Sequence, residues 1–320
     1  MGDVYIMATS GSINYARNRD QLIDTSLKLL GVLGEGETAS ANAVTDMSVL
    51  LNSMVKGWQA QGVNLWREDE AVIFLTDGTA EYTLASTSDH ASAEIIKTEL
   101  SVAGATSDTT ITVDAVTSMA TSDNIGVELD DNTIDWSTIS SINTTTKVIT
   151  MAAGLGGAAA VDNNVYVYTT RLARPLKILQ ARLLYDNGTE RELRKYGRGE
   201  YFQLPNKTLE GKPVAYYYSP QVSTGKLYLW PTPDAVEDRI RITYVRTIED
   251  FDASTDDPDL PQEWFDALAY NLAVHASPMY GIDLNKTNPV LLSLAANMQN
   301  ALFAYDSEDA STYIVGGYET

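Results

Sequence analysis

Near the amino terminus, apolar positions recur at the spacing of amphipathic helices. Asp20 is a suitable N-cap for a first helix, and a second apolar run begins after Ser40 and ends at Gly62. The apolar residues of the two runs are Leu22, Ile23, Leu27, Leu30 and Leu33, then Val44, Met47, Leu50, Leu51, Met54, Val55 and Trp58. A short glycine-rich turn separates the runs, so the pattern predicts a helical hairpin over residues 1–66.

From residue 67 the pattern changes to that of short strands. Residues 71–75 and 80–84 flank Asp77 and Gly78, a common hairpin turn pair. Aromatic and β-branched runs bounded by prolines follow at residues 201–204, 214–218, 226–230 and 240–245. The sequence therefore predicts a β domain formed by residues 67–84 and 171–250.

Residues 85–170 differ in composition from the segments on either side. They are rich in Thr, Ser, Asp and small residues, and five strand-like runs alternate there with turn signals such as Asp130-Asp131-Asn132. Short strands at this spacing are typical of a small all-β module. We expect this module to be an insertion into the β domain.

Helical spacing returns after a polar linker at residues 252–261. One run includes Trp264, Phe265, Leu268, Leu272 and His275, and the last includes Leu291, Ala295, Met298, Leu302 and Tyr305. These runs predict a second helical hairpin over residues 251–306, followed by an extended arm at residues 307–320. The expected fold is α+β, with a four-helix bundle built from the N- and C-terminal helix pairs and a central β domain carrying the all-β insertion.

Charge divides the chain further. It has 22 basic and 43 acidic side chains and a formal net charge of −21, which disfavours general nucleic-acid binding. Residues 1–83, 84–168 and 251–320 have net charges of −6, −9 and −10, whereas residues 169–250 have +4. The candidate interface residues of this basic block are Arg171, Arg174, Arg182, Arg191, Arg194, Lys195 and Arg198. Contact with acidic surface on a neighbouring copy is the favoured interpretation, with DNA contact and a solvated face as alternatives.

The residue types used for catalysis and metal binding are scarce. The chain has no cysteine and only two histidines, His90 and His275, which excludes thiolate chemistry, disulfides and zinc sites with several imidazole ligands. The glycine-rich residues 154–157 lack the helix that follows a dinucleotide loop. The Asp groups at residues 130–135 and 256–259 lack the register of a calcium loop, so solvated turns are expected. We expect no catalytic, cofactor-binding or metal-binding residues, and we do not expect the protein to be an enzyme.

The lengths of the apolar runs and the residues at the two ends of the chain indicate where the protein is expected to reside. No apolar run reaches the length needed to span a bilayer, and residues 1–10 lack the pattern of a secretion signal, so no membrane contact is expected. The last residues are strand-prone, and Tyr313, Ile314, Val315 and Tyr318 form a candidate docking arm.

Several stretches together resemble the head-to-tail adaptor family of tailed bacteriophages, the packaged-DNA-stabilising or tail accessory factors. They are residues 19–37, 58–66, 207–218, 229–234 and 260–281. The resemblance implies a virion structural protein at the head–tail junction, made in the host cytoplasm. It implies a ring of twelve copies that docks below the portal protein, continues the channel for double-stranded DNA, helps to retain the packaged genome and carries tail nozzle or tail fibre proteins. The docking arm would then reach the portal.

The insertion at residues 85–170 departs from this family pattern and leaves an alternative open. A β-rich virion protein could bind carbohydrate or another surface by stacking sugars on exposed aromatic rings. Trp136, Tyr166 and Tyr168 are the candidates for such stacking. A carboxylate-based hydrolase is a weaker alternative, because no paired acid and base can be located in the sequence.

Overall fold

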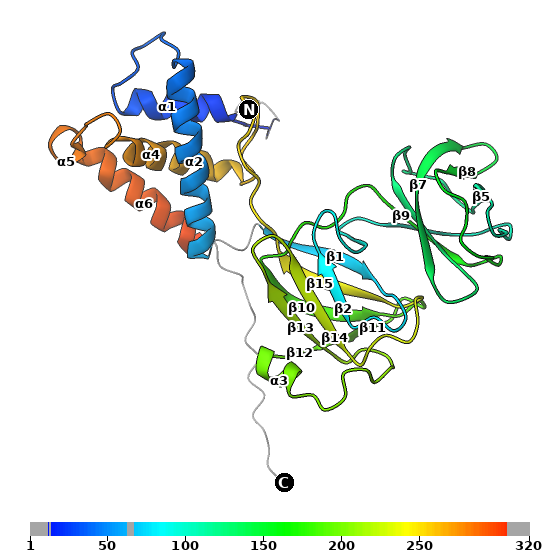
Figure 1. The fold of residues 1–320 in the computed structure, drawn as a ribbon. Helices are drawn as coiled ribbons and strands as arrows, with labels where there is room; N and C mark the ends of the chain where they lie inside the picture. Colours follow the sequence, from blue (N-terminus) through cyan, green and yellow to red (C-terminus); the bar gives the residue numbers. More distant parts are fainter. Residues whose placement is uncertain (1–11, 13, 63–66, 306–320) are drawn as a thin grey trace, which may run out of the picture. The chain divides into compact units, whose positions relative to one another are not determined.

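The computed structural model describes residues 12, 14–62 and 67–305, and these residues fold into two compact units (Figure 1). The first unit combines Met1–Trp66 with Ile248–Thr320, and its described part is helical. The second unit, Arg67–Thr247, contains every described strand.

Capping residues define the start of α1 and the end of α2 in the first unit. Its elements are α1 (Arg19–Leu29), α2 (Ala41–Gln61), the 3-10 turn η2 (Gln262–Trp264), α4 (Phe265–Ala276), α5 (Leu284–Thr287) and α6 (Pro289–Tyr305). Asn18, not Asp20, caps α1, because its side chain accepts the N–H of Gln21 while the Gln21 side chain accepts the N–H of Asn18. Gly62 ends α2 in the left-handed conformation, at φ 101°.

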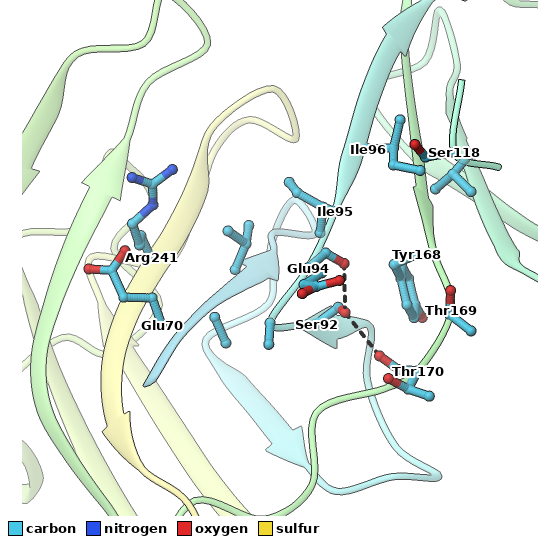
Figure 2. Close-up of a pocket in the computed structure, with 14 residues that line it drawn as sticks. Glu70, Ser92, Glu94, Ile95, Ile96, Ser118, Tyr168, Thr169, Thr170 and Arg241 are labelled. Atoms are coloured by element: carbon cyan, nitrogen blue, oxygen red, sulfur yellow. Dashed lines mark hydrogen bonds between the residues drawn. The ribbon is translucent and has the colours of Figure 1, made fainter. Parts of the chain in front are cut away.

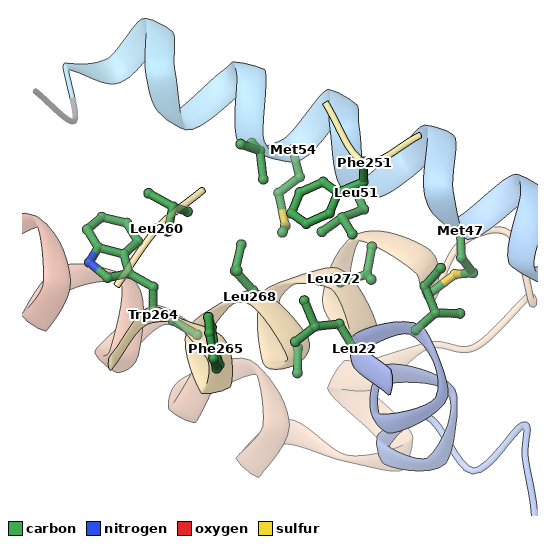
Figure 3. Packing of buried hydrophobic residues seen from close by; sticks show 14 of the residues in the cluster. Leu22, Met47, Leu51, Met54, Phe251, Leu260, Trp264, Phe265, Leu268 and Leu272 are labelled. Atoms are coloured by element: carbon green, nitrogen blue, oxygen red, sulfur yellow. The ribbon is translucent and has the colours of Figure 1, made fainter. Parts of the chain in front are cut away.

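The predicted four-helix bundle is wrong. The described chain is β-rich, with three sheets, and in the helical unit α1, α2 and α6 all pack against α4. Figure 3 shows the core between α2, α1 and α4, where Leu51, Leu268 and Leu272 meet. The physical reason lies in α4, which is buried on nearly every side because it alternates large apolar residues with small ones. Its buried residues are Phe265, Ala267, Leu268, Ala269, Asn271, Leu272, Ala273 and Ala276.

The second unit contains a β-sandwich. Its five-stranded sheet has the order β11-β10-β15-β1-β3, and its four-stranded sheet has the order β12-β13-β14-β2. The first sheet is built from β1 (Glu68–Phe74), β3 (Ala91–Ser92), β10 (Lys177–Leu184), β11 (Glu190–Glu192) and β15 (Arg239–Val245). The second is built from β2 (Glu81–Leu84), β12 (Arg194–Lys195), β13 (Ala215–Pro220) and β14 (Gly225–Trp230). Ile73, Leu227 and Ile242 belong to one core shared by both sheets.

A six-stranded sheet forms between β3 and β10 in the sequence, with the order β4-β9-β6-β7-β8-β5. Its strands are β4 (Ile96–Glu99), β5 (Thr110–Thr112), β6 (Asn124–Glu128), β7 (Ile134–Asn143), β8 (Val148–Met151) and β9 (Asn164–Tyr168). The two edge strands meet just beyond their ends, where Leu100 bridges Val113 and the N–H of Ser101 donates to the carbonyl of Thr112 at 3.0 Å. The sheet therefore curls around its own apolar core.

The strand predicted at residues 201–204 is wrong, because a short helix, α3 (Arg198–Phe202), occupies this place. The carboxylate of Glu200 accepts the N–H of Gly197 at 2.7 Å, which satisfies one of the free donors at the start of the helix. Tyr201 is buried, and the ring of Phe202 is left half-exposed beside the sandwich.

Candidate functional site

An aromatic cluster joins the six-stranded sheet to the sandwich. Phe74 of β1 lies 5.0 Å from Trp136, 4.9 Å from Tyr166 and 6.2 Å from Tyr168, measured between ring centroids. Tyr166 is 0% exposed and Tyr168 is buried, while Trp136 is partly covered by the stacked ring of His90. The three aromatic residues considered for sugar stacking are therefore packing residues, and the structure argues against that site.

His90 occupies a polar corner of this aromatic cluster. Its ring stacks on Trp136 with a centroid distance of 3.8 Å and an interplanar angle of 5°. Its Nε2 faces a guanidinium nitrogen of Arg171 at 3.3 Å, so the neutral ring accepts there and donates from Nδ1 to the Tyr168 hydroxyl. Burial, with a further contribution from the Arg171 charge, lowers the pKa of His90 to about 4. The neutral imidazole thus fits a structural role.

A cleft of about 730 Å³ lies beside this junction, between β1, β3, β4 and β9 (Figure 2). Glu70 and Arg241 lie at one end, and Ser92 lies near Glu94 and Thr170 farther along. The Ser92 hydroxyl is within 2.9 Å of the carbonyls of both Glu94 and Thr170, so this polar group is engaged with the backbone.

Three cations of the predicted basic block are engaged within the sandwich. Arg182 forms ion pairs with Glu70 and Glu190 on the five-stranded sheet. A guanidinium nitrogen of Arg191 donates to the carbonyl of Pro213 at 2.7 Å. The ammonium of Lys195 donates to the carbonyl of Ile178 at 2.6 Å, and burial lowers its pKa. These three residues make contacts within the sandwich, and their place at a subunit interface stays a prediction.

The other four cations of the block lie in separate places. Arg171 faces His90 and Tyr168 at the junction, and Arg174 is half-buried near β10. Arg194 and Arg198 are exposed, and each guanidinium lies over an aromatic ring of its own chain, at 5.4 Å from the Tyr196 centroid and 5.8 Å from the Phe202 centroid. The block is therefore not one continuous patch.

Sequence reasoning missed an exposed aromatic group that stands beside Arg198. The rings of Tyr217 and Tyr228, on neighbouring strands β13 and β14, stack at 5.6 Å, and Phe202 lies about 6 Å from both, at 6.1 and 6.2 Å. The ammonium of Lys207 lies 5.7 Å from the Phe202 centroid. We call Arg198, Phe202, Lys207, Tyr217 and Tyr228 the aromatic–basic surface. The signal that could have found it is strand alternation, because Tyr216 and Tyr218 point inward and Tyr217 does not.

The remaining sequence candidates take local roles or lie outside the described residues. The Asp135 carboxylate accepts the N–H of Gly156 at 2.9 Å, and the Asp256 carboxylate accepts the N–H groups of Asp252 and Ala253. Across residues 12, 14–62 and 67–305, no three His, Asp or Glu side chains gather in a way that could hold a metal ion, and no helix is long and apolar enough to cross a membrane. His275 is exposed near the end of α4. The candidate arm residues Tyr313, Ile314, Val315 and Tyr318 lie outside the described residues.

Comparison with known protein families gives a match over much of the chain. The sequence model of the SU10 adaptor protein family matches residues 123–313, more than half of the chain and parts of both compact units. No curated protein is similar enough to count as a match.

Two solved structures from bacteriophage P23-77 are weakly similar to the chain. The complex of its two major capsid proteins, VP16 and VP17, is 11% identical, with a TM-score of 0.12, and the match covers 56% of this chain and 82% of that one. The capsid protein VP17 alone is 10% identical, with the same TM-score of 0.12, over 57% and 83% of the two chains. TM-scores this low carry no argument about fold or function.

Proposed function

The chain belongs to the SU10 adaptor protein family, and on that premise we propose that it is a ring-forming head-to-tail adaptor. Family membership makes it a phage adaptor-type protein and a structural protein of the bacteriophage virion. In the proposed role, a ring of twelve copies docks below the portal protein at the head–tail junction. The ring continues the DNA channel, helps to retain the packaged genome and provides the platform for tail nozzle or tail fibre proteins.

The observation that carries the proposal is the extent of the family match. Residues 123–313 include most strands of the six-stranded sheet, strands β10 to β15 of the sandwich and all of α4, α5 and α6. The match thus includes residues from both compact units, so it is not confined to one common β module.

The distribution of charge supports an assembly in which two different faces of neighbouring copies meet. Residues 1–66 and 248–320 carry 5 basic and 19 acidic side chains, a net formal charge of −14, whereas exposed cations such as Arg194 and Arg198 belong to the β-rich unit. A ring is a head-to-tail assembly, which requires two different and complementary faces on each copy. One chain with acidic and basic faces meets that requirement.

The proposed role includes no turnover chemistry and no sequence-specific contact with DNA. A chain with a net charge of −21 repels the phosphates of double-stranded DNA, which favours passage over adhesion. We therefore propose that DNA passes through the ring as cargo in transit, and that the partners of the chain are other virion proteins.

Native mass spectrometry of the chain mixed with the purified portal protein of its phage tests the proposal. We expect a portal assembly that carries a closed set of adaptor copies, with twelve as the proposed number. A portal that stays bare while the chain stays monomeric would contradict the proposed function.

We also propose that the C-terminal arm, with Tyr313, Ile314, Val315 and Tyr318, contacts the portal. Deleting residues 307–320 should then weaken portal binding, because a strand-prone apolar segment is removed from the contact. A variant with the same fourteen-residue region scrambled separates the effect of sequence from that of length and charge. Equal portal affinity for the intact, deleted and scrambled chains would refute a role for the arm.

A further inference from the structure

The aromatic–basic surface includes a large apolar side chain that is half exposed. Phe202 is 50% exposed, although it lies against Tyr217 and Tyr228. Two further large apolar side chains in the segment that follows α3, Leu209 and Val214, are 44% and 40% exposed. A group of exposed apolar side chains beside cations is characteristic of a protein–protein interface, where aromatic residues and Arg are enriched.

Two exposed cations, Arg198 of this surface and Arg194 of the neighbouring strand β12, form no ion pair with a carboxylate within the described part of the chain. Arg198 lies over Phe202 and Arg194 over Tyr196, and both side chains are exposed. In contrast, Arg182 on the same unit is paired with Glu70 and Glu190. A guanidinium stacked on a ring keeps its N–H donors directed outward, so Arg194 and Arg198 are available to an acidic partner.

The helical unit of the same chain carries a surface of the opposite kind. A cleft of about 590 Å³ is lined by Glu249, Asp250, Phe251, Asp252, Ala253, Asp256 and Asp257. Asp250 is paired with Lys56, and Asp256 accepts backbone N–H groups. The side chains of Asp252 and Asp257 are exposed and, among the described residues, have no cationic partner. We call this site the acidic cleft.

We propose that the aromatic–basic surface of one copy docks on the acidic cleft of a second copy. The argument is charge complementarity, because exposed cations next to Phe202 match a unit whose net charge is −14. The inference rests on the proposed ring, and it names the two faces that would meet at each subunit contact. The contact joins different faces, so repeating it around a symmetry axis closes a ring. A nucleic acid is the less favoured occupant, because the whole chain is strongly acidic.

Compensating charge reversal tests the pairing. One variant carries Arg194→Glu and Arg198→Glu, a second carries Asp252→Lys and Asp257→Lys, and a third carries all four substitutions. Native mass spectrometry and titration onto purified portal measure how many copies load and at what concentration. Each half-reversed variant should load at least about tenfold more weakly, because like charges then face each other, and the fourfold variant should recover loading to within about threefold.

Matched controls separate a local effect from a change in overall charge or folding. Lys147→Glu reverses one cation on an exposed side chain in the turn before β8, and it should load normally. Phe202→Ser should weaken loading, whereas Val222→Ser, at a side chain that is 98% exposed, should not. Recovery in the fourfold variant also shows that the half-reversed chains fail through the contact and not through misfolding.

The possible failures are distinguishable. If the unmodified chain forms the ring but the half-reversed variants load normally, or the fourfold variant does not recover, the pairing of these two faces is refuted and the adaptor role stands. If the unmodified chain does not load at all, the adaptor role itself is refuted. If the Arg194 and Arg198 reversal leaves loading intact but abolishes binding to a short duplex DNA probe, the surface contacts nucleic acid and the inference falls.

Discussion

Protonation of His90 should weaken the junction between the six-stranded sheet and the sandwich. In the folded chain the neutral ring accepts from Arg171 at 3.3 Å and stacks on Trp136 at 3.8 Å. A proton on Nε2 would remove that acceptor and set two positive charges against each other. The His90 pKa is lowered to about 4, mainly by burial, from its usual value of 6.5.

The size and sign of the effect follow from this pKa difference. The folded state favours the neutral ring, so the contribution to stability is complete above pH 6.5 and is lost as the pH falls toward 4. A pKa lowered from 6.5 to about 4 corresponds to about 3 kcal/mol before screening. Because the imidazole is only partly buried, solvent screening reduces the expected loss to about 1–2 kcal/mol.

Urea unfolding of the intact chain at about pH 7 and about pH 4.5 measures this loss. The unmodified chain should lose about 1–2 kcal/mol more between these conditions than His90→Gln does, because the variant has no ring to protonate. His275→Gln is the matched control, since it removes the other, exposed histidine and should follow the unmodified chain. Equal pH dependence for the unmodified chain and His90→Gln, or an NMR titration that places the His90 pKa near 6.5, would refute the reasoning.

Two further predictions concern packing. Leu268 is 0% exposed at the centre of α4, so Leu268→Ala should reduce the unfolding free energy by about 2–5 kcal/mol. Thermal or urea unfolding, followed by the helical signal, measures this change. A loss below about 0.5 kcal/mol would contradict the central position of α4. A Cβ at Gly126 would lie 2.5 Å from the indole of Trp136, so Gly126→Ala should cost about 1–3 kcal/mol and change the near-UV circular dichroism. An unchanged Trp136 environment in that variant would show that the ring does not pack on β6.

Local periodicity was sufficient to predict individual elements. The apolar spacing predicted α1, α2, α4 and α6, and the strand-like runs predicted most of the β-strands. The predicted arrangement of the helices is wrong, because the stripe of large apolar residues in α4 does not reveal that the alanines between them are buried as well. Ala267, Ala269 and Ala273 let neighbouring helices pack on the other sides of α4. The division of the β part into a domain and an insertion stays a prediction, since both lie within one compact unit, Arg67–Thr247.

The candidate site was harder to predict than the fold. The distribution of charge identifies a basic block, but it does not show that Arg182 forms an ion pair with Glu70, a residue 112 positions away. Such a pairing depends on the order of the strands in the sheet, here β10-β15-β1, which apolar periodicity along one chain does not specify. The exposed side of Phe202 was also hidden, because its segment had the residue types of a strand and formed a helix under the local influence of Glu200.

An electron-microscopy image of the assembled virion would show whether the chain forms a closed ring between head and tail. With the density of the chain identified by a label on a variant of this protein, we expect closed rotational symmetry, twelvefold in the proposed form, on the axis just below the portal. Density found over the capsid shell, or as isolated copies on the tail, would contradict it.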